Sequence, residues 1–174
     1  MRPSFISVSK GHFKDIPEPC RYCLYWQTTG DHEGGMLDPA GEADKQKWID
    51  AVTIEFGNCA LVACLAGRAV GFVFYAPASV VPRTREYRSR GPSDDAIFVA
   101  CLYVADEKHR GEGLGSAMLK ELENDLRKRG HRAIETFARR SSANNPSGPL
   151  AFYVKHGFRI LKDDKDFPLV RREL

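Results

Sequence analysis

The spacing of hydrophobic positions changes several times along the chain, and each change marks a predicted element. Apolar residues three or four positions apart predict a helix over residues 42–56, and Gly57 is a typical helix stop. Leucine and methionine recur every four residues from Leu114 onward, which is the clearest helical pattern in the chain. This helix ends with basic residues and Gly130, as the negative end of a helix favours.

Short continuous apolar runs alternate with these helices and have the length of strands. Runs 59–64 and 69–76 are separated by Ala66-Gly67-Arg68, which predicts an antiparallel hairpin. The remaining predicted elements are strands at residues 4–8, 96–104, 133–137, 158–161 and 167–171, and short helices at residues 20–26 and 150–156. One strand–helix–strand crossover combined with hairpins indicates an α/β domain with a mixed sheet, and we expect a single domain over residues 1–174.

Composition restricts the class of protein further. A hydrophobic fraction of 43% and a charged fraction of 28% are typical of a globular domain. The net charge is only +3, which gives no support to nucleic-acid binding. No apolar stretch approaches the roughly 20 residues of a membrane span, and no secretory signal is recognised, so we expect a cytoplasmic protein. Five cysteines, an odd number, argue against a disulfide framework.

A glycine-rich turn, Arg110-Gly-Glu-Gly-Leu-Gly115, joins the strand at residues 96–104 directly to the clearest helix. A helix start offers unpaired backbone N–H groups and a positive dipole end, and glycines let the main chain approach a diphosphate. A Walker-type loop would need Gly-Lys-Ser/Thr, whereas this chain has Gly115-Ser116. A dinucleotide-binding motif would open the first strand–helix–strand unit, whereas this turn comes only after several strands. The turn therefore predicts a phosphate site of another kind.

Two motifs resemble the GNAT superfamily of acetyl-CoA-dependent N-acetyltransferases. The family signature is Arg/Gln-x-x-Gly-x-Gly/Ala at a strand-to-helix turn, which Arg110, Gly113 and Gly115 match. Residues 151–158, Ala-Phe-Tyr-Val-Lys-His-Gly-Phe, are similar to the family's second motif. The resemblance implies a mixed, mostly antiparallel sheet of six to seven strands flanked by about four helices. It also implies acetyl-CoA as the co-substrate, with no metal, and transfer of an acetyl group to a primary amine.

The same resemblance implies roles for particular residues. The backbone of Leu102, Tyr103 and Val104, at a splay or bulge in its strand, would pair with the pantetheine arm of the cofactor. Backbone amides of the turn would hold the pyrophosphate, from Arg110, Gly111, Glu112, Gly113, Leu114, Gly115 and Ser116. Asn145 lies near the position of a side chain that contacts pantetheine in many members. Tyr153 matches the tyrosine that protonates the departing thiolate, a role that suits a phenol held close to sulfur.

The chain departs from the family pattern where a general base is expected. Many members carry a carboxylate on the strand before the glycine turn, where this chain has Val99-Ala-Cys101. Asp94, Asp95, Glu86 and His32 are loop candidates, although solvated loop side chains are the commoner interpretation. A non-catalytic acyl-CoA-binding module therefore remains an alternative to an enzyme.

Other features leave several interpretations open. Cys20-x-x-Cys23 suggests structural thiols, half of a metal site that lacks two further ligands, or a substrate-facing or redox role. Arginines in the loop at residues 77–95 would meet a phosphate or an acidic acceptor, or stay solvated, and the same alternatives hold for Lys155 and Arg139. This loop and residues 20–41 would select the acceptor, a small-molecule or peptide amine that the sequence does not identify. A homodimer through the last strands is compatible with the pattern.

Overall fold

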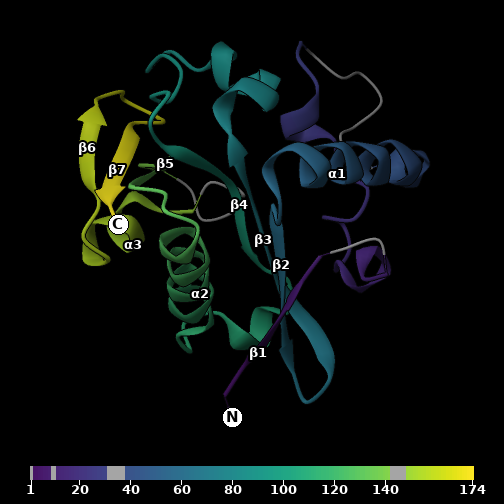
Figure 1. Ribbon diagram of the computed structural model, residues 1–174. Coiled ribbons are helices and arrows are strands. Elements are labelled where there is room, and N and C mark those ends of the chain that lie inside the picture. Colours follow the sequence, from purple (N-terminus) through teal and green to yellow (C-terminus); the bar gives the residue numbers. More distant parts are fainter. Residues whose placement is uncertain (1, 9–10, 31–37, 142–147) are drawn as a thin grey trace.

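The computed structural model describes residues 2–8, 11–30, 38–141 and 148–174. A seven-stranded sheet forms its centre, in the order β1-β2-β3-β4-β5-β7-β6 (Figure 1). The strands are β1 (Ser4–Ser7), β2 (Ala60–Leu65), β3 (Arg68–Pro77), β4 (Ile97–Val104), β5 (Ala133–Phe137), β6 (Arg159–Lys162) and β7 (Leu169–Glu173). Neighbouring strands are antiparallel except for β4 and β5, which run parallel. This mixed, mostly antiparallel sheet confirms the predicted fold class.

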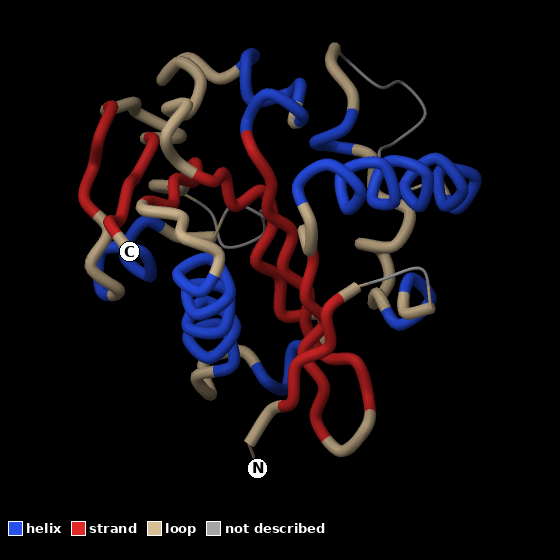
Figure 2. Tube along the Cα trace, viewed as in Figure 1, coloured by secondary structure: helices blue, strands red, loops and turns tan. Residues whose placement is uncertain are grey.

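Within the described residues, three α-helices cover the two faces of the sheet (Figure 2). They are α1 (Glu42–Phe56), α2 (Leu114–Lys128) and α3 (Leu150–Lys155). Ile49 of α1 belongs to the apolar cluster on one face, whereas Met118 of α2 and Tyr153 of α3 belong to the cluster on the other. No helix in this part of the chain is long and apolar enough to cross a membrane.

The predicted helix at residues 20–26 is wrong. Turns occupy residues 18–22, and only Tyr25–Gln27 forms a short 3-10 helix. The reason is tertiary packing: Trp26 is buried, stacked on Tyr87 at 5.5 Å between ring centroids and placed edge-on to Phe98 at 5.1 Å. Burying one large ring in the core beneath the sheet outweighs the weak helical preference of a seven-residue segment.

β4 and β5 separate soon after they begin to pair. In the described residues their parallel register joins only Ile97 to Ile134 and Phe98 to Glu135. On its other side, β4 contains a bulge, because Phe74 and Tyr75 of β3 pair with Cys101 and Val99 and leave Ala100 as an extra residue. Residues 99–104 of β4 therefore present an edge toward β5 that β5 does not pair.

Candidate active site

A cavity of about 650 Å³ lies where β4 and β5 diverge, between the start of α2 and helix α3. Its walls come from three parts of the chain: the second half of β4, the turn before α2, and α3 with the residues beside it. The lining residues are Leu102, Tyr103, Val104, Glu107, His109, Arg110, Gly111, Gly113, Gly115, Ser116, Gly148, Pro149, Phe152, Tyr153, Lys155 and His156. The structure thus brings together residues that are more than fifty positions apart in sequence.

The glycine turn forms one end of this cavity. Gly111 and Gly113 have φ angles of +81° and +87°, a left-handed conformation that favours glycine. Gly113 is the N-cap of α2, so the first backbone N–H groups of the helix follow it directly. Gly115 lies in the first turn, where an added Cβ would come 3.5 Å from Phe152 of α3. The local geometry is that of an anion site at a helix N-terminus.

Arg110 is held at the entrance to the turn. Its Nε donates to Val104 O at 3.3 Å, and its Nη1 donates to Glu107 Oε1 at 2.9 Å. These bonds fix the arginine between the end of β4 and the turn while its side chain stays partly exposed. A cation in this position favours a phosphate-bearing ligand.

Tyr153 of α3 forms part of the opposite wall. The side chain is 1% exposed and packs edge-on against Phe152 and Phe158, with ring centroids 5.2 and 5.1 Å apart. Burial raises the pKa of the Tyr153 phenol above its ordinary value, and a hydrogen bond with Thr136 opposes this shift. The phenol therefore keeps its proton at neutral pH.

Comparison with known proteins fits this geometry. Residues 20–158 match the model of the acetyltransferase (GNAT) family. The chain belongs to the GNAT acetyltransferase family. By its family and its fold, the protein is an enzyme of the acyltransferase class. A search among curated proteins gave no match.

Solved structures of similar fold include several acetyltransferases. The PaiA N-acetyltransferase from Thermoplasma acidophilum, crystallised with coenzyme A, aligns with a TM-score of 0.64 and 16% identity over 100% of both chains. An acetyltransferase from Thermus thermophilus aligns with a TM-score of 0.61 and 20% identity, over 100% of this chain and 98% of that one. The Escherichia coli ribosomal-protein-S18-alanine N-acetyltransferase aligns with a TM-score of 0.59 and 14% identity, over 99% of this chain and 94% of that one. At such identities the likeness establishes the shared fold.

Most residues predicted for the GNAT site line the cavity, but two of the described ones do not. Leu114 is buried in the core beneath α2, and the exposed Glu112 side chain contacts His109 Nδ1 at 3.1 Å. Both were predicted through their backbone amides, so the positions of their side chains leave that prediction untested. Asn145 lies outside the described residues.

The sequence analysis missed His156, at the end of α3. His156 and Lys155 line the cavity, and His156 Nε2 lies 2.8 Å from Ser116 Oγ. The available signal was the place of His156 in the motif at residues 151–158, three residues after Tyr153. Spacing gave no indication that His156 would meet α2, because its partner is 40 positions away.

Two of the loop candidates for a general base, Glu86 and Asp95, are engaged in other contacts. Glu86 pairs with Arg83 at 3.1 Å and accepts from the backbone N–H of Gly30 at 2.6 Å. Asp95 forms a two-pronged ion pair with Arg171 of β7, through bonds of 2.9 and 2.8 Å. His32 lies outside the described residues. No base is therefore assigned.

Arginines of the loop at residues 77–95 do not line the cavity among the described residues. Arg83 is instead buried, and its guanidinium donates to the backbone carbonyls of Thr28 and Gly30, each at 3.0 Å. It therefore ties the two segments expected to select the acceptor, residues 20–41 and 77–95, to each other. All five cysteines are free thiols, and the described residues contain no group of three or more ligands able to hold a metal ion.

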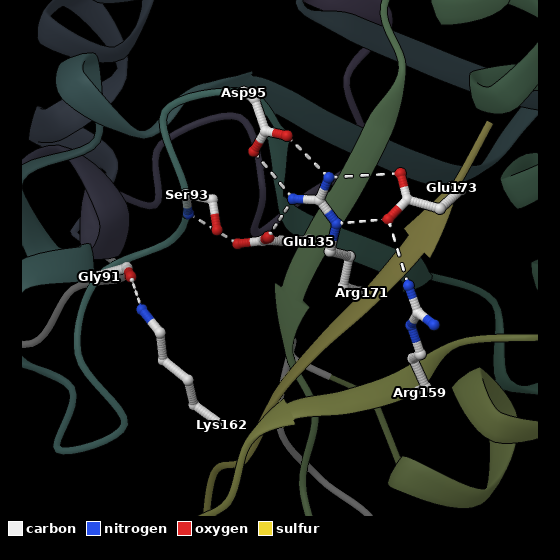
Figure 3. A network of polar contacts seen from close by, with 8 residues as sticks. All are labelled: Gly91, Ser93, Asp95, Glu135, Arg159, Lys162, Arg171 and Glu173. Atoms are coloured by element: carbon white, nitrogen blue, oxygen red, sulfur yellow. Dashed lines mark hydrogen bonds and ion pairs between the residues drawn. The ribbon is translucent and has the colours of Figure 1, made fainter.

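Arg171 connects the same loop to the sheet (Figure 3). Besides Asp95, its guanidinium contacts Glu135 of β5 at 2.8 Å and Glu173 at 2.7 Å. Glu135 is fully buried, and its second oxygen accepts from the backbone N–H of Ser93 at 2.8 Å. The network fixes residues 93–95 against β5 and β7 next to the point where β4 begins.

Replacing Arg171 with methionine should lower the melting temperature by roughly 6–12 °C at neutral pH, because Glu135 would remain buried without its cation. Arg171 lowers the pKa of Asp95 and Glu173. Their stabilising effect is therefore present above the ordinary carboxyl pKa and lost as pH falls through the lowered values. The difference between wild type and variant should accordingly shrink below about pH 4.

Thermal unfolding as a function of pH measures both effects. Arg159→Met is the matched control, because exposed Arg159 makes only a 3.5 Å contact with Glu173. Its shift should stay within about 2 °C. An equal shift for the two variants would contradict the role given to Arg171.

Proposed function

We propose that the chain transfers an acetyl group from acetyl-CoA to a primary amine, by direct attack in a ternary complex. The observation that carries this proposal is the single cavity shared by the unpaired edge of β4, the glycine turn and Tyr153. These are the three parts that a thioester cofactor with a diphosphate requires: a strand edge for its amide-containing arm, an anion site, and a proton donor near sulfur.

The residues present fit such a cofactor. The backbone of Leu102, Tyr103 and Val104 would pair with the amides of the pantetheine arm, because β5 leaves that edge of β4 free. The N–H groups from Arg110 to Ser116 would hold the pyrophosphate, together with the positive end of α2. Arg110 and Lys155 add positive charge to the cavity wall. Asn145 remains a predicted contact to pantetheine.

In the reaction, a C–N bond forms at the acetyl carbon as its bond to sulfur breaks, and acetyl-CoA supplies the activated acetyl group. Tyr153 would donate its proton toward the sulfur as negative charge develops there. The attacking amine must be neutral and would lose its extra proton to water, since no side chain is assigned as base. A backbone N–H near Tyr103 or Val104 would stabilise the carbonyl oxygen.

Release of free thiol from acetyl-CoA, measured against a panel of amines, tests the proposal directly. The panel should include primary amines with and without a carboxylate, as well as peptide N-termini and lysines. Arg139, which follows β5, motivates this choice because it is 6% exposed and its Nε and Nη2 lack partners in the described residues. Two unpaired nitrogens on a buried guanidinium favour an anionic ligand group.

Amine-dependent thiol release supports the transferase. Tight binding of acetyl-CoA without release for any amine would instead favour the alternative, a non-catalytic acyl-CoA-binding module. The apolar stretch Val99-Ala-Cys101, buried where many GNAT members carry a carboxylate, is the observation that supports this alternative.

A further inference from the structure

Ser116 and His156 form a hydrogen-bonded pair in the wall of the cavity. Ser116 lies in the first turn of α2, and His156 is the C-cap of α3. Nε2 of His156 is 2.8 Å from Ser116 Oγ, while Nδ1 is 2.7 Å from the backbone oxygen of Phe152. Both ring nitrogens are therefore engaged, one by a hydroxyl and the other by a carbonyl.

The carbonyl of Phe152 determines where the neutral imidazole carries its hydrogen. A carbonyl oxygen only accepts hydrogen bonds, so Nδ1 must be the donor. A neutral imidazole has one N–H, and Nε2 can then only accept. The hydroxyl of Ser116 must consequently donate its single hydrogen to Nε2. Toward any other group, Ser116 Oγ can then only accept a hydrogen bond. In this state Ser116 cannot donate to an anion.

Protonation of His156 reverses this arrangement. Nε2 of the imidazolium carries a hydrogen and donates to Ser116 Oγ, which frees the hydroxyl hydrogen for another acceptor. Ser116 follows Gly115 in the turn where the first N–H groups of α2 face the cavity. The freed hydroxyl adds one hydrogen-bond donor to that anion site. The same protonation places a positive charge on His156, next to the hydroxyl.

We propose that His156 takes up a proton when the cofactor binds, and that it acts through Ser116 as a positioning residue for the diphosphate. The inference rests on the proposed function, which assigns the diphosphate to this turn. Coenzyme A affinity should therefore increase as pH falls through the range in which imidazoles titrate.

Several charged groups surround the pair and define the controls. Glu107, His109, Arg110 and Lys155 line the same cavity, and Arg172 of β7 donates to the backbone oxygen of His156. Arg172 also pairs with Glu123 of α2 at 3.0 Å. Of these groups, His109 is the one that also carries an imidazole. It contacts Glu112 rather than Ser116 and is the matched control.

Calorimetric titration with coenzyme A at about pH 6 and about pH 8 tests the inference. Wild type is compared with His156→Gln, Ser116→Ala and His109→Gln, after thermal unfolding has shown that each variant is folded. The 3′-phosphate of the ligand itself titrates near pH 6, to the same extent with every protein. The ratio of affinities at the two pH values is therefore compared between proteins rather than interpreted alone.

This ratio should be about fivefold larger for wild type than for His156→Gln or Ser116→Ala, because a hydrogen bond to a charged acceptor is gained only with the proton. His109→Gln should keep the wild-type ratio. Titrations in buffers of different ionisation enthalpy should also show greater proton uptake for wild type than for His156→Gln.

A wild-type ratio retained in Ser116→Ala would show that His156 does not act through the hydroxyl and would overturn the proposal. Equal affinity ratios for wild type and His156→Gln would also overturn it. The same holds if the ratio falls in His109→Gln but in neither of the other two variants. If wild-type protein bound coenzyme A at neither pH, the proposed function itself would be wrong, and the inference would fail with it. The two failures are thus distinguishable.

Discussion

Gly113→Glu should reduce the affinity for coenzyme A by about 100-fold or more. Gly113 has φ of +87° at the N-cap of α2, in the wall of the cavity. A glutamate there would place a carboxylate beside the N–H groups proposed to hold the diphosphate, so two anions would compete for one site. Isothermal calorimetry on the folded variant measures the loss.

Two further variants separate charge from backbone strain. Gly113→Ala keeps the site uncharged and should weaken binding much less. Gly67→Glu introduces the same side chain at φ of +75° in the turn between β2 and β3, outside the cavity. It carries a similar conformational cost, about 1–2 kcal/mol, and should leave the affinity unchanged. Wild-type affinity in a folded Gly113→Glu variant would exclude the glycine turn from the cofactor site.

Local sequence predicted most of the fold because most elements depend on local signals. The four-residue recurrence of Leu114, Met118, Leu122 and Leu126 buries one face of α2, and the structure places all four in one apolar cluster. Ala66 and Gly67 both have positive φ, as a two-residue hairpin turn requires, and they join β2 to β3. Such elements could be predicted to within about two residues.

Elements set by distant contacts could not be predicted in this way. Trp26 is held by Phe98 and Tyr87, which lie more than sixty positions away, and this packing replaces the expected helix with turns. The sequence also gave no sign that Arg171 would gather Asp95, Glu135 and Glu173 around one guanidinium. These contacts exist only once the sheet order is established.

The candidate site likewise contains local features, which sequence predicts, and contacts between distant segments, which it does not. Gly111, Gly113 and Gly115 belong to one short motif, so this turn could be singled out from sequence, and the structure shows that it lines a cavity. The position of Tyr153 opposite this turn was expected from resemblance alone. The contact between Ser116 and His156 joins two helices and required three-dimensional placement. A feature formed by one continuous segment could thus be predicted from sequence, whereas a contact between two distant segments could not.

Tyr153→Phe should lower kcat by about 100-fold or more while changing KM for acetyl-CoA little. The phenylalanine ring preserves the packing against Phe152 and Phe158, so the loss would report on the hydroxyl rather than on the fold. Because burial raises the pKa of Tyr153, the wild-type phenol stays protonated at its ordinary pKa near 10. Its activity should therefore show no alkaline decline from this group around that pH.

Tyr75→Phe provides the matched control for loss of a buried hydroxyl. The Tyr75 hydroxyl donates to Asp125 and accepts from Asn58, each at 2.7 Å, and it lies outside the cavity. This variant should be less stable than wild type by about 1–3 kcal/mol yet retain its turnover. Steady-state kinetics across pH distinguishes the two variants. If Tyr153→Phe kept turnover within about twofold of wild type at every pH, the proton donor would have to be another group or water, because positioned acid catalysis contributes far more than that.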